Sequence, residues 1–380
     1  MKTCRNSASL IIAAYNKQNN NDSSLATYNY SLLCLKRHQK SSFLPGSYVF
    51  PGGVAEPADA DLKWNNIFSK FNLNYKNLLP LIPNTAQPSI LKSAVGELPR
   101  QVSLRITAIR ETFEECGILI CKKHTTKKSR YNWAQHLEGN GKYKYIYKAG
   151  SFNNNFKIVI DPDIDLHDWK SKVHSDATQF YELCEKLQCY PDLWALHEWS
   201  NWMTPLYMSG KRFDTIFFLT CLSSIPETNF DEKEMEDMKW DLPNNFFKTE
   251  SEIILPPPQY YEIKRIGNFQ ILEDLHRFAA DCSMKNIQLF LPVRVNLLDG
   301  FVHVLPGDSM YPEEAKTQGE QVLDKTDMTI RELRDISYKK NRFEFFLDFT
   351  KKQLVIDNFD IISDVFVSPK VYIENLKTKL

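Results

Sequence analysis

The segment from residue 104 to 122 places the strongest constraint on how this chain folds. It begins LRITAIRETFEECG, in which Ile106, Ile109 and Phe113 recur at helical spacing and form one apolar face. Gly117 follows as a helix stop, because glycine readily adopts the left-handed backbone conformation that ends many helices. The next run, ILICK, has the character of a buried strand. The segment therefore predicts a helix packed on a sheet, as in an α/β protein.

The same helix carries a concentration of negative charge. Glu111, Glu114 and Glu115 lie at positions i, i+3 and i+4, so their side chains project from one face about one turn apart. Like charges at this spacing destabilise an isolated helix by about 0.2–0.5 kcal/mol per pair. The pattern is typical of a solvated acidic surface, and also of a site where a divalent cation neutralises the carboxylates. This pattern alone leaves both interpretations open.

Composition argues against several classes of partner. The 380 residues include 47 Lys and Arg and 47 Asp and Glu, so the formal net charge is zero and no overall basic field favours nucleic acid. No run approaches the roughly 18 apolar residues of a transmembrane helix, so we expect no membrane partner. Eight cysteines without a CxxC pair predict reduced thiols rather than disulfides.

The rest of the chain reads as strands and helices separated by loops. A proline-punctuated segment at 57–100 is interpreted as an insertion, and residues 163–189 carry one long helical pattern. Short β-like runs dominate after residue 288. The other expected elements are strands at 7–15, 29–37, 194–205 and 211–222, a turn at 255–258 and a helix at 269–283.

The carboxylate helix resembles the second half of the Nudix box, G-x5-E-x7-R-E-U-x-E-E-x-G-U, where U is aliphatic. Thr112 departs from it by standing where an aliphatic residue is usual. The positions that match are Arg110, Glu111, Glu114, Glu115, Gly117 and Ile118.

The first half of the box is displaced. Gly53 and Asp59 resemble G-x5-E with Asp in place of Glu, but fifty residues then separate Asp59 from Arg110 instead of seven. Gly96 has the unbroken spacing, yet Val102 then occupies the acidic position. We therefore expect Gly53 and the helix to form one site that an insertion splits.

Five further stretches are similar to the coenzyme A diphosphatase branch of the Nudix hydrolase superfamily. They are FLPGSYVFPGG, EWSNWMTP, KRFDTIFFL, LPPPQ and LPGDSMYP. The resemblance implies an α/β fold, a Nudix α/β/α sandwich around a mixed β-sheet, with helical insertions and a β-containing C-terminal extension. It assigns residues 7–285 to a Nudix domain with insertions at about 57–100 and 125–190, and residues 286–380 to the extension.

The resemblance implies metal-dependent hydrolysis of the pyrophosphate of coenzyme A and acyl-CoA to 3′,5′-ADP and (acyl-)4′-phosphopantetheine, with Mg²⁺ or Mn²⁺ as cofactor. Glu111 and Glu115 would be the main metal ligands, and Glu114 would bind metal or activate water. Arg110 would orient these glutamates. A backbone carbonyl near Gly52 or Gly53 could complete the coordination.

Other roles come from residues outside the box. Glu234 is the candidate general base, with Glu236 as an alternative, whereas a structural role is expected for Glu198. The candidate substrate-binding residues are Gly52, Gly53, Lys36, Arg37 and Arg212. The basic run at 122–130 is interpreted either as a solvated loop or as a contact for the 3′-phosphate. Core positions are expected for Trp194, Trp199 and Trp202.

The sequence also suggests a location and leaves other activities open. Thr378, Lys379 and Leu380 resemble the Ser-Lys-Leu address read by the peroxisomal import receptor. The peroxisome is therefore the expected location, with cytoplasm or mitochondrion as alternatives. The competing functions are a Nudix hydrolase of ADP-ribose, NADH or capped RNA, and a Nudix-fold binding protein without catalysis.

Overall fold

The structure is a computed structural model of the chain. It describes residues 4–16, 28–82, 88–123, 165–208, 210–226, 228, 230, 234–248, 253–283, 287–312, 321–347 and 352–358. The strands are β1 (Cys4–Tyr15), β2 (Tyr30–Arg37), β3 (Tyr48–Val49), β4 (Gly52–Val54), β5 (Cys121–Lys123), β6 (Cys189–Pro191), β7 (His197–Met203), β8 (Arg212–Leu222), β9 (Met235–Asp241), β10 (Leu289–Phe290), β11 (Val293–Leu297), β12 (Gly300–Val304), β13 (Val322–Lys325), β14 (Lys340–Phe346) and β15 (Lys352–Asp357). The helices are α1 (Trp64–Lys70), α2 (Tyr75–Leu78), α3 (Arg100–Cys116), α4 (Leu166–Ser175), α5 (Thr178–Leu187), α6 (Pro257–Ile266), α7 (Leu272–Cys282) and α8 (Ile330–Ile336).

The centre of the fold is an eight-stranded mixed sheet in the order β10-β7-β8-β1-β2-β3, with β4 paired to β1 and β9 paired to β2. β1 runs parallel to β8 and antiparallel to β2 and β4. Leu10 and Ile12 point into one core, whereas Ile11 and Ala13 point into the other. The uninterrupted apolar run of β1 is explained by this burial on both faces.

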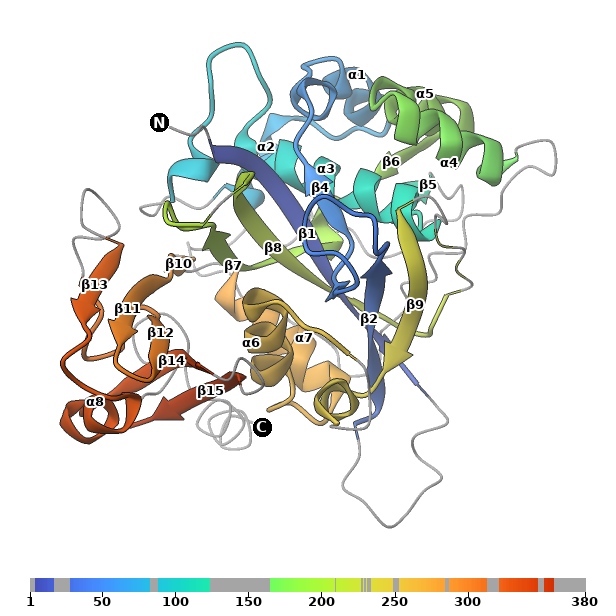
Figure 1. The fold of residues 1–380 in the computed structure, drawn as a ribbon. Coiled ribbons are helices and arrows are strands. Elements are labelled where there is room, and N and C mark those ends of the chain that lie inside the picture. Colours follow the sequence, from blue (N-terminus) through green and yellow to red (C-terminus); the bar gives the residue numbers. More distant parts are fainter. Residues whose placement is uncertain are drawn as a thin grey trace, which may run out of the picture.

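Helices cover both faces of this sheet (Figure 1). α3 packs on one face together with α1, α4 and α5, and α6 and α7 pack on the other. The two insertions meet on the α3 side, where the Trp64 ring lies 5.2 Å from Tyr181 and 5.9 Å from Phe180 between centroids. The predicted α/β/α sandwich around a mixed sheet is confirmed.

The C-terminal part forms a separate five-stranded sheet, β13-β11-β12-β14-β15, with α8 against it. Phe343 of β14 reaches into the core beside α6, and its ring centroid lies 5.8 Å from that of Tyr260. The β-containing extension therefore packs on the Nudix sandwich. The exact boundaries 7–285 and 286–380 stay predictions.

Three expected elements differ in the structure. The helical pattern at 163–189 is two helices, because Asp176 is extended (φ −152°) and its carboxylate accepts from Thr178 N–H at 2.9 Å. The strand after Gly117 covers only Cys121–Lys123, and not residues 118–120. The prolines predicted to form a turn instead begin α6. The first turn of a helix tolerates proline, because the N–H groups there have no partner within the helix. Most of the 125–190 insertion, residues 125–164, lies outside the described residues.

None of the described helices is long and apolar enough to span a bilayer. All eight cysteines are free thiols, and seven of them are buried.

Candidate active site

The glycine loop and the carboxylate helix lie against each other. Gly53 of β4 faces Glu111 of α3 so closely that a β-carbon on Gly53 would lie 2.4 Å from the Glu111 carboxylate. Gly52, at φ +153°, donates its N–H to Glu115 Oε2 at 2.8 Å. Gly96, by contrast, faces open space. The structure thus joins Gly53, not Gly96, to the helix across the insertion.

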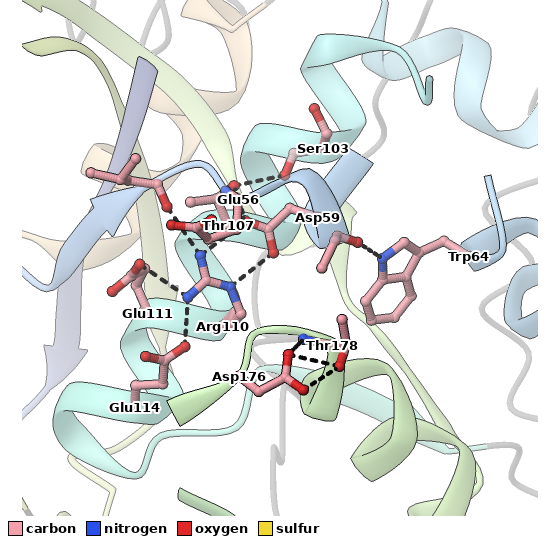
Figure 2. Close-up of polar contacts among 12 residues, drawn as sticks. Glu56, Asp59, Trp64, Ser103, Thr107, Arg110, Glu111, Glu114, Asp176 and Thr178 are labelled. Atoms are coloured by element: carbon pink, nitrogen blue, oxygen red, sulfur yellow. Dashed lines mark hydrogen bonds and ion pairs between the residues drawn. The ribbon is translucent and has the colours of Figure 1, made fainter. Parts of the chain in front are cut away.

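Arg110 is the centre of the polar network in this site (Figure 2). Its buried guanidinium donates from Nε to Asp59 Oδ1 at 2.8 Å and from Nη2 to Asp59 Oδ2 at 2.9 Å. Nη1 donates to Glu111 Oε1 at 3.0 Å and to Glu114 Oε1 at 2.5 Å. Nη2 also donates to the carbonyl of Val54 at 3.1 Å. The Arg110 side chain therefore links the carbonyl of Val54 and the carboxylate of Asp59 to two glutamates of α3.

Asp59 is also held in place by a residue of α3. It lies in a 3-10 helix at Pro57–Ala60, is buried, and accepts from the Thr107 hydroxyl of α3 at 2.8 Å. Asp59, which stands where the Nudix box has the longer glutamate, therefore accepts from Arg110 with both carboxylate oxygens.

The carboxylates of α3 do not form a solvated surface. Glu114 and Glu115 are 6% and 4% exposed. Burial raises the pKa of Glu111 to about 8 and the pKa of Glu114 to about 7. Burial, then the charge of Glu111, holds the pKa of Glu115 well above its usual range. The interpretation of the helix as an exposed acidic face is wrong.

This donor set fits a hard divalent cation. In each of the three glutamates, one carboxylate oxygen accepts a hydrogen bond from a protein N–H. The other oxygen of each is the one that would bind the metal ion. Among the described residues, only a group of three cysteines brings all its potential ligand atoms within 4.8 Å of one another. The oxygens of the three glutamates are not grouped this closely. Mg²⁺ commonly binds one or two carboxylates and keeps several waters.

A cavity of about 880 Å³ opens beside the cluster. Its lining includes Glu111 and Glu114 of α3, and also His303 of β12 and Phe343 of β14 from the C-terminal sheet. Its walls are mostly apolar, with a few charged groups. Both parts of the chain therefore build one cavity.

Sequence comparisons match this architecture. The profile of the NUDT19 Nudix domain matches residues 4–266, and that of the NUDT19 C-terminal domain matches residues 294–351. The chain belongs to the NUDT19 family of Nudix hydrolases. Nudix hydrolases generally need a divalent metal ion, in agreement with the oxygen-rich cluster on α3.

Named relatives of this NUDT19-family chain cover most of its length. "Acyl-coenzyme A diphosphatase NUDT19" of Xenopus laevis is 35% identical over 317 residues, which is 80% of this chain and 76% of the relative. The Homo sapiens protein of the same name is 35% identical over 301 residues, 75% of this chain and 73% of the relative. The crystal structure of a Nudix hydrolase from Alicyclobacillus acidocaldarius is 19% identical, covers 73% of this chain and 97% of its own, and has a TM-score of 0.47.

Most of the residues predicted for the site lie together. Glu115 is not on the cavity wall but sits behind it, bonded to Gly52. Glu234 lies at the wall beside β9, and its charge adds to the burial and to the charge of Glu111 in raising the pKa of Glu115. The predicted residues on the wall are Arg37, Gly52, Gly53, Arg110, Glu111, Glu114 and Glu234.

Two predicted substrate-binding residues in this NUDT19-family chain lie elsewhere. Lys36 pairs with Glu236 at 3.8 Å and is not on the cavity wall. Arg212 is buried, donates from Nε to the Thr204 carbonyl at 3.1 Å and is also not on the wall. In both places the neighbouring residue, Arg37 or Lys211, lines the cavity instead. Lys36 and Arg37 are adjacent in β2, and adjacent residues of a strand face opposite sides. Lys211 precedes β8, whereas Arg212 is its first residue.

The alternative candidates have structural partners. Glu236 accepts from the Gln39 N–H at 2.8 Å, and Glu198 pairs with buried Arg105 at 3.0 Å. From the basic run, Lys122 pairs with Asp192 at 2.8 Å, and residues 124–130 lie outside the described part of the chain.

Of the three tryptophans, Trp199 and Trp202 are buried and both donate to Glu262 at 2.7 Å, whereas Trp194 is only half-buried. Trp202 also lines the cavity.

The sequence analysis missed His174. This residue lies near the C-terminal end of α4, lines the cavity and has Nδ1 3.8 Å from Glu114 Oε2. It follows the box by about sixty residues in a segment without a recognisable motif, so only the fold reveals it.

The raised carboxyl pKa values predict a link between pH, metal and stability. Between the ordinary value of 4.5 and about 8, the folded metal-free chain keeps protons on Glu111 that the unfolded chain has released. The free energy of unfolding of the metal-free protein should therefore fall as pH rises through this window.

A divalent cation binds the ionised carboxylates, so the rise in Tm on adding Mg²⁺ should grow with pH. Thermal denaturation with EDTA or Mg²⁺ from about pH 5 to about pH 8 measures this. An equal Mg²⁺ effect at both ends contradicts it.

Proposed function

We propose that this chain hydrolyses the diphosphate bridge of coenzyme A and acyl-CoA to 3′,5′-ADP and (acyl-)4′-phosphopantetheine, with Mg²⁺ or Mn²⁺ held by Glu111, Glu114 and Glu115. The observation that carries the proposal is one cavity in which a buried carboxylate cluster adjoins apolar walls. That combination suits a diphosphate with a long, largely uncharged arm. The diphosphatase names of relatives at 35% identity support the same substrate class.

The cluster supplies the charge that this reaction needs. A bound divalent ion neutralises the diphosphate and lowers the pKa of a coordinated water. Arg110 holds Glu111 and Glu114 at fixed positions, and the Gly52 N–H holds Glu115. These contacts preorganise the ligands before substrate arrives.

Proton transfer is assigned to Glu234, with His174 as the second candidate. As water adds to one phosphorus, its proton passes to Glu234, and the bridging oxygen leaves with the electrons of the broken P–O bond. Both side chains line the cavity beside the cluster. Glu234→Gln and His174→Gln, compared by their pH–rate profiles, distinguish the two.

The cavity wall carries cationic and apolar groups that suit different parts of the substrate. Arg37 and Lys211 are the cationic groups placed to meet the phosphates of the 3′,5′-ADP moiety. Phe43, Phe213 and Phe217 offer apolar surface to the pantetheine arm and acyl chain.

Product analysis tests the proposal. The purified chain is incubated with Mg²⁺ and coenzyme A, acetyl-CoA, ADP-ribose or NADH, and the products are identified by mass spectrometry. Release of 3′,5′-ADP from coenzyme A and acetyl-CoA is the expected result. AMP from NADH or ADP-ribose without 3′,5′-ADP would point to another Nudix activity. No product from any substrate would favour a binding protein.

The peroxisomal location stays a prediction from Thr378, Lys379 and Leu380, which lie outside the described residues. Localisation of a tagged chain with and without these three residues would test both the address and the import receptor as a partner.

A further inference from the structure

Three cysteines form a buried cluster away from the carboxylate site. The potential ligand atoms of Cys121, Cys184 and Cys189, their Sγ atoms, all lie within 4.8 Å of one another. All three residues are at most 2% exposed. No other set of three or more His, Cys, Asp or Glu side chains in the described ranges is as closely grouped. We call these three residues the thiol cluster.

The backbone brings the thiols together from three elements. Cys121 begins β5 and Cys189 begins β6, and in this antiparallel pair Cys121 lies opposite Pro191 while Lys123 lies opposite Cys189. Cys121 and Cys189 are therefore diagonal neighbours on the same face of the pair. Cys184 comes from α5, which ends at Gln188 in the left-handed conformation (φ +50°) immediately before β6. That turn folds Cys184 back onto the two strands.

The thiol cluster lies in the hydrophobic core on the α3 side of the sheet, where α5 meets the short strands β5 and β6. β5 and β6 form a two-stranded sheet with no further strand among the described residues. Such a pair has little stability of its own. Other buried cysteines, such as Cys34 and Cys282, belong to the aromatic-rich core on the α6 and α7 side. A metal ion bound by the thiol cluster would therefore join α5 to this strand pair.

The chemistry of the cluster favours metal binding over simple packing. Thiolates are soft ligands that select Zn²⁺ and Cu⁺ over Mg²⁺. Zn–S bonds of about 2.3 Å place the sulfurs of a tetrahedral site about 3.8 Å apart. The observed grouping requires little movement to reach that geometry.

We propose that Cys121, Cys184 and Cys189 bind one thiophilic metal ion of the Zn²⁺ class, which ties α5 to β5 and β6. Binding releases the thiol protons, and a water supplies a fourth ligand. The site acts on the cavity at a distance. Ala177 and Thr178 at the start of α5, and Asp176 before it, line the cavity, so the ion holds that wall in place.

Cobalt substitution tests the proposal on the full-length chain. The protein is purified under reducing conditions, titrated with Co²⁺ and followed by absorption, because thiolate ligands give a near-ultraviolet charge-transfer band that carboxylate ligands do not. This readout separates the thiol cluster from the Mg²⁺ site. Elemental analysis of the protein as purified should find one Zn²⁺ per chain. After a chelator has removed this ion, one equivalent of Co²⁺ should produce the band, and added Zn²⁺ should abolish it.

Serine variants locate the ligands. Cys184→Ser and Cys189→Ser should lose the band, whereas Cys282→Ser, a buried cysteine of α7, should keep it. Circular dichroism checks that each variant is folded, and the wild-type titration decides the question even where a variant is not. No thiolate band in the wild type, a band that survives Cys184→Ser in a folded protein, or a disulfide between two of the three cysteines would each overturn the proposal.

Discussion

Glu111→Gln is expected to lower kcat/KM for acetyl-CoA hydrolysis by about 10³-fold, since metal ligation contributes several kcal/mol and about 1.4 kcal/mol is a factor of ten. Glutamine has the same shape as glutamate and its carbonyl still accepts from Arg110, so the change removes charge without opening a cavity. Glu111 is half-buried, lies against Gly53 and lines the cavity, so the lost charge is one that faces the site. Steady-state kinetics over a range of Mg²⁺ concentrations measures the loss.

Glu236→Gln is the matched control. Glu236 is also an acid near the site, but it bonds to the Gln39 backbone and is not on the cavity wall. Its replacement should leave kcat/KM within about twofold. If Glu111→Gln kept most of its activity, the cluster on α3 would not be the metal site. If both variants lost activity equally, the loss would reflect general disruption of the fold.

The second large effect is expected at Asp59. Removing one partner of a buried ion pair costs about 3–5 kcal/mol where the other charge is left uncompensated. The cost at Asp59 is expected to be smaller, because Arg110 keeps Glu111 and Glu114 as partners. Asp59→Ala removes both bonds to the Arg110 Nε and Nη2 atoms, and neither partner is more than 2% exposed. The variant should unfold at a clearly lower denaturant concentration and lose activity, because Arg110 no longer holds Glu111 and Glu114 in place.

An exposed ion pair provides the comparison for Asp59. Asp168 and Lys172 pair at 2.7 Å on the surface of α4, and such pairs contribute about 0–1 kcal/mol. Asp168→Ala should therefore change the unfolding midpoint only slightly. Equal, small effects of both substitutions would show that the Asp59–Arg110 contact is not a structural element of the site.

The helix at the site was predictable because its signals are local. Ile106, Ile109 and Phe113 set the apolar period, and Gly117 adopts the left-handed conformation (φ +70°) that ends α3. The link from Gly53 to this helix was predictable only through the Nudix resemblance. No local signal joins residues separated by an insertion.

The errors have physical causes. Lys36 and Arg37 are adjacent, and sequence alone does not say which of two neighbours faces the cavity, because that depends on the strand's partner in the sheet. His174 reaches the site only through the packing of α4 on α3. The burial of Glu114 and Glu115 could not be predicted from the sequence either. The second insertion covers this side of the sheet, and no sequence pattern shows that it packs against these two residues.

The pairing of β1 with β8 has a consequence for how the protein is made. Cys4 pairs with Arg212 and Ala14 with Leu222, so β1 gains its longest neighbour only after residues 16–211 have been synthesised. Until then, the edge of an apolar strand stays open to other chains. We expect nascent chains stopped before residue 212 to aggregate and to depend on chaperones, however well α3 itself has formed.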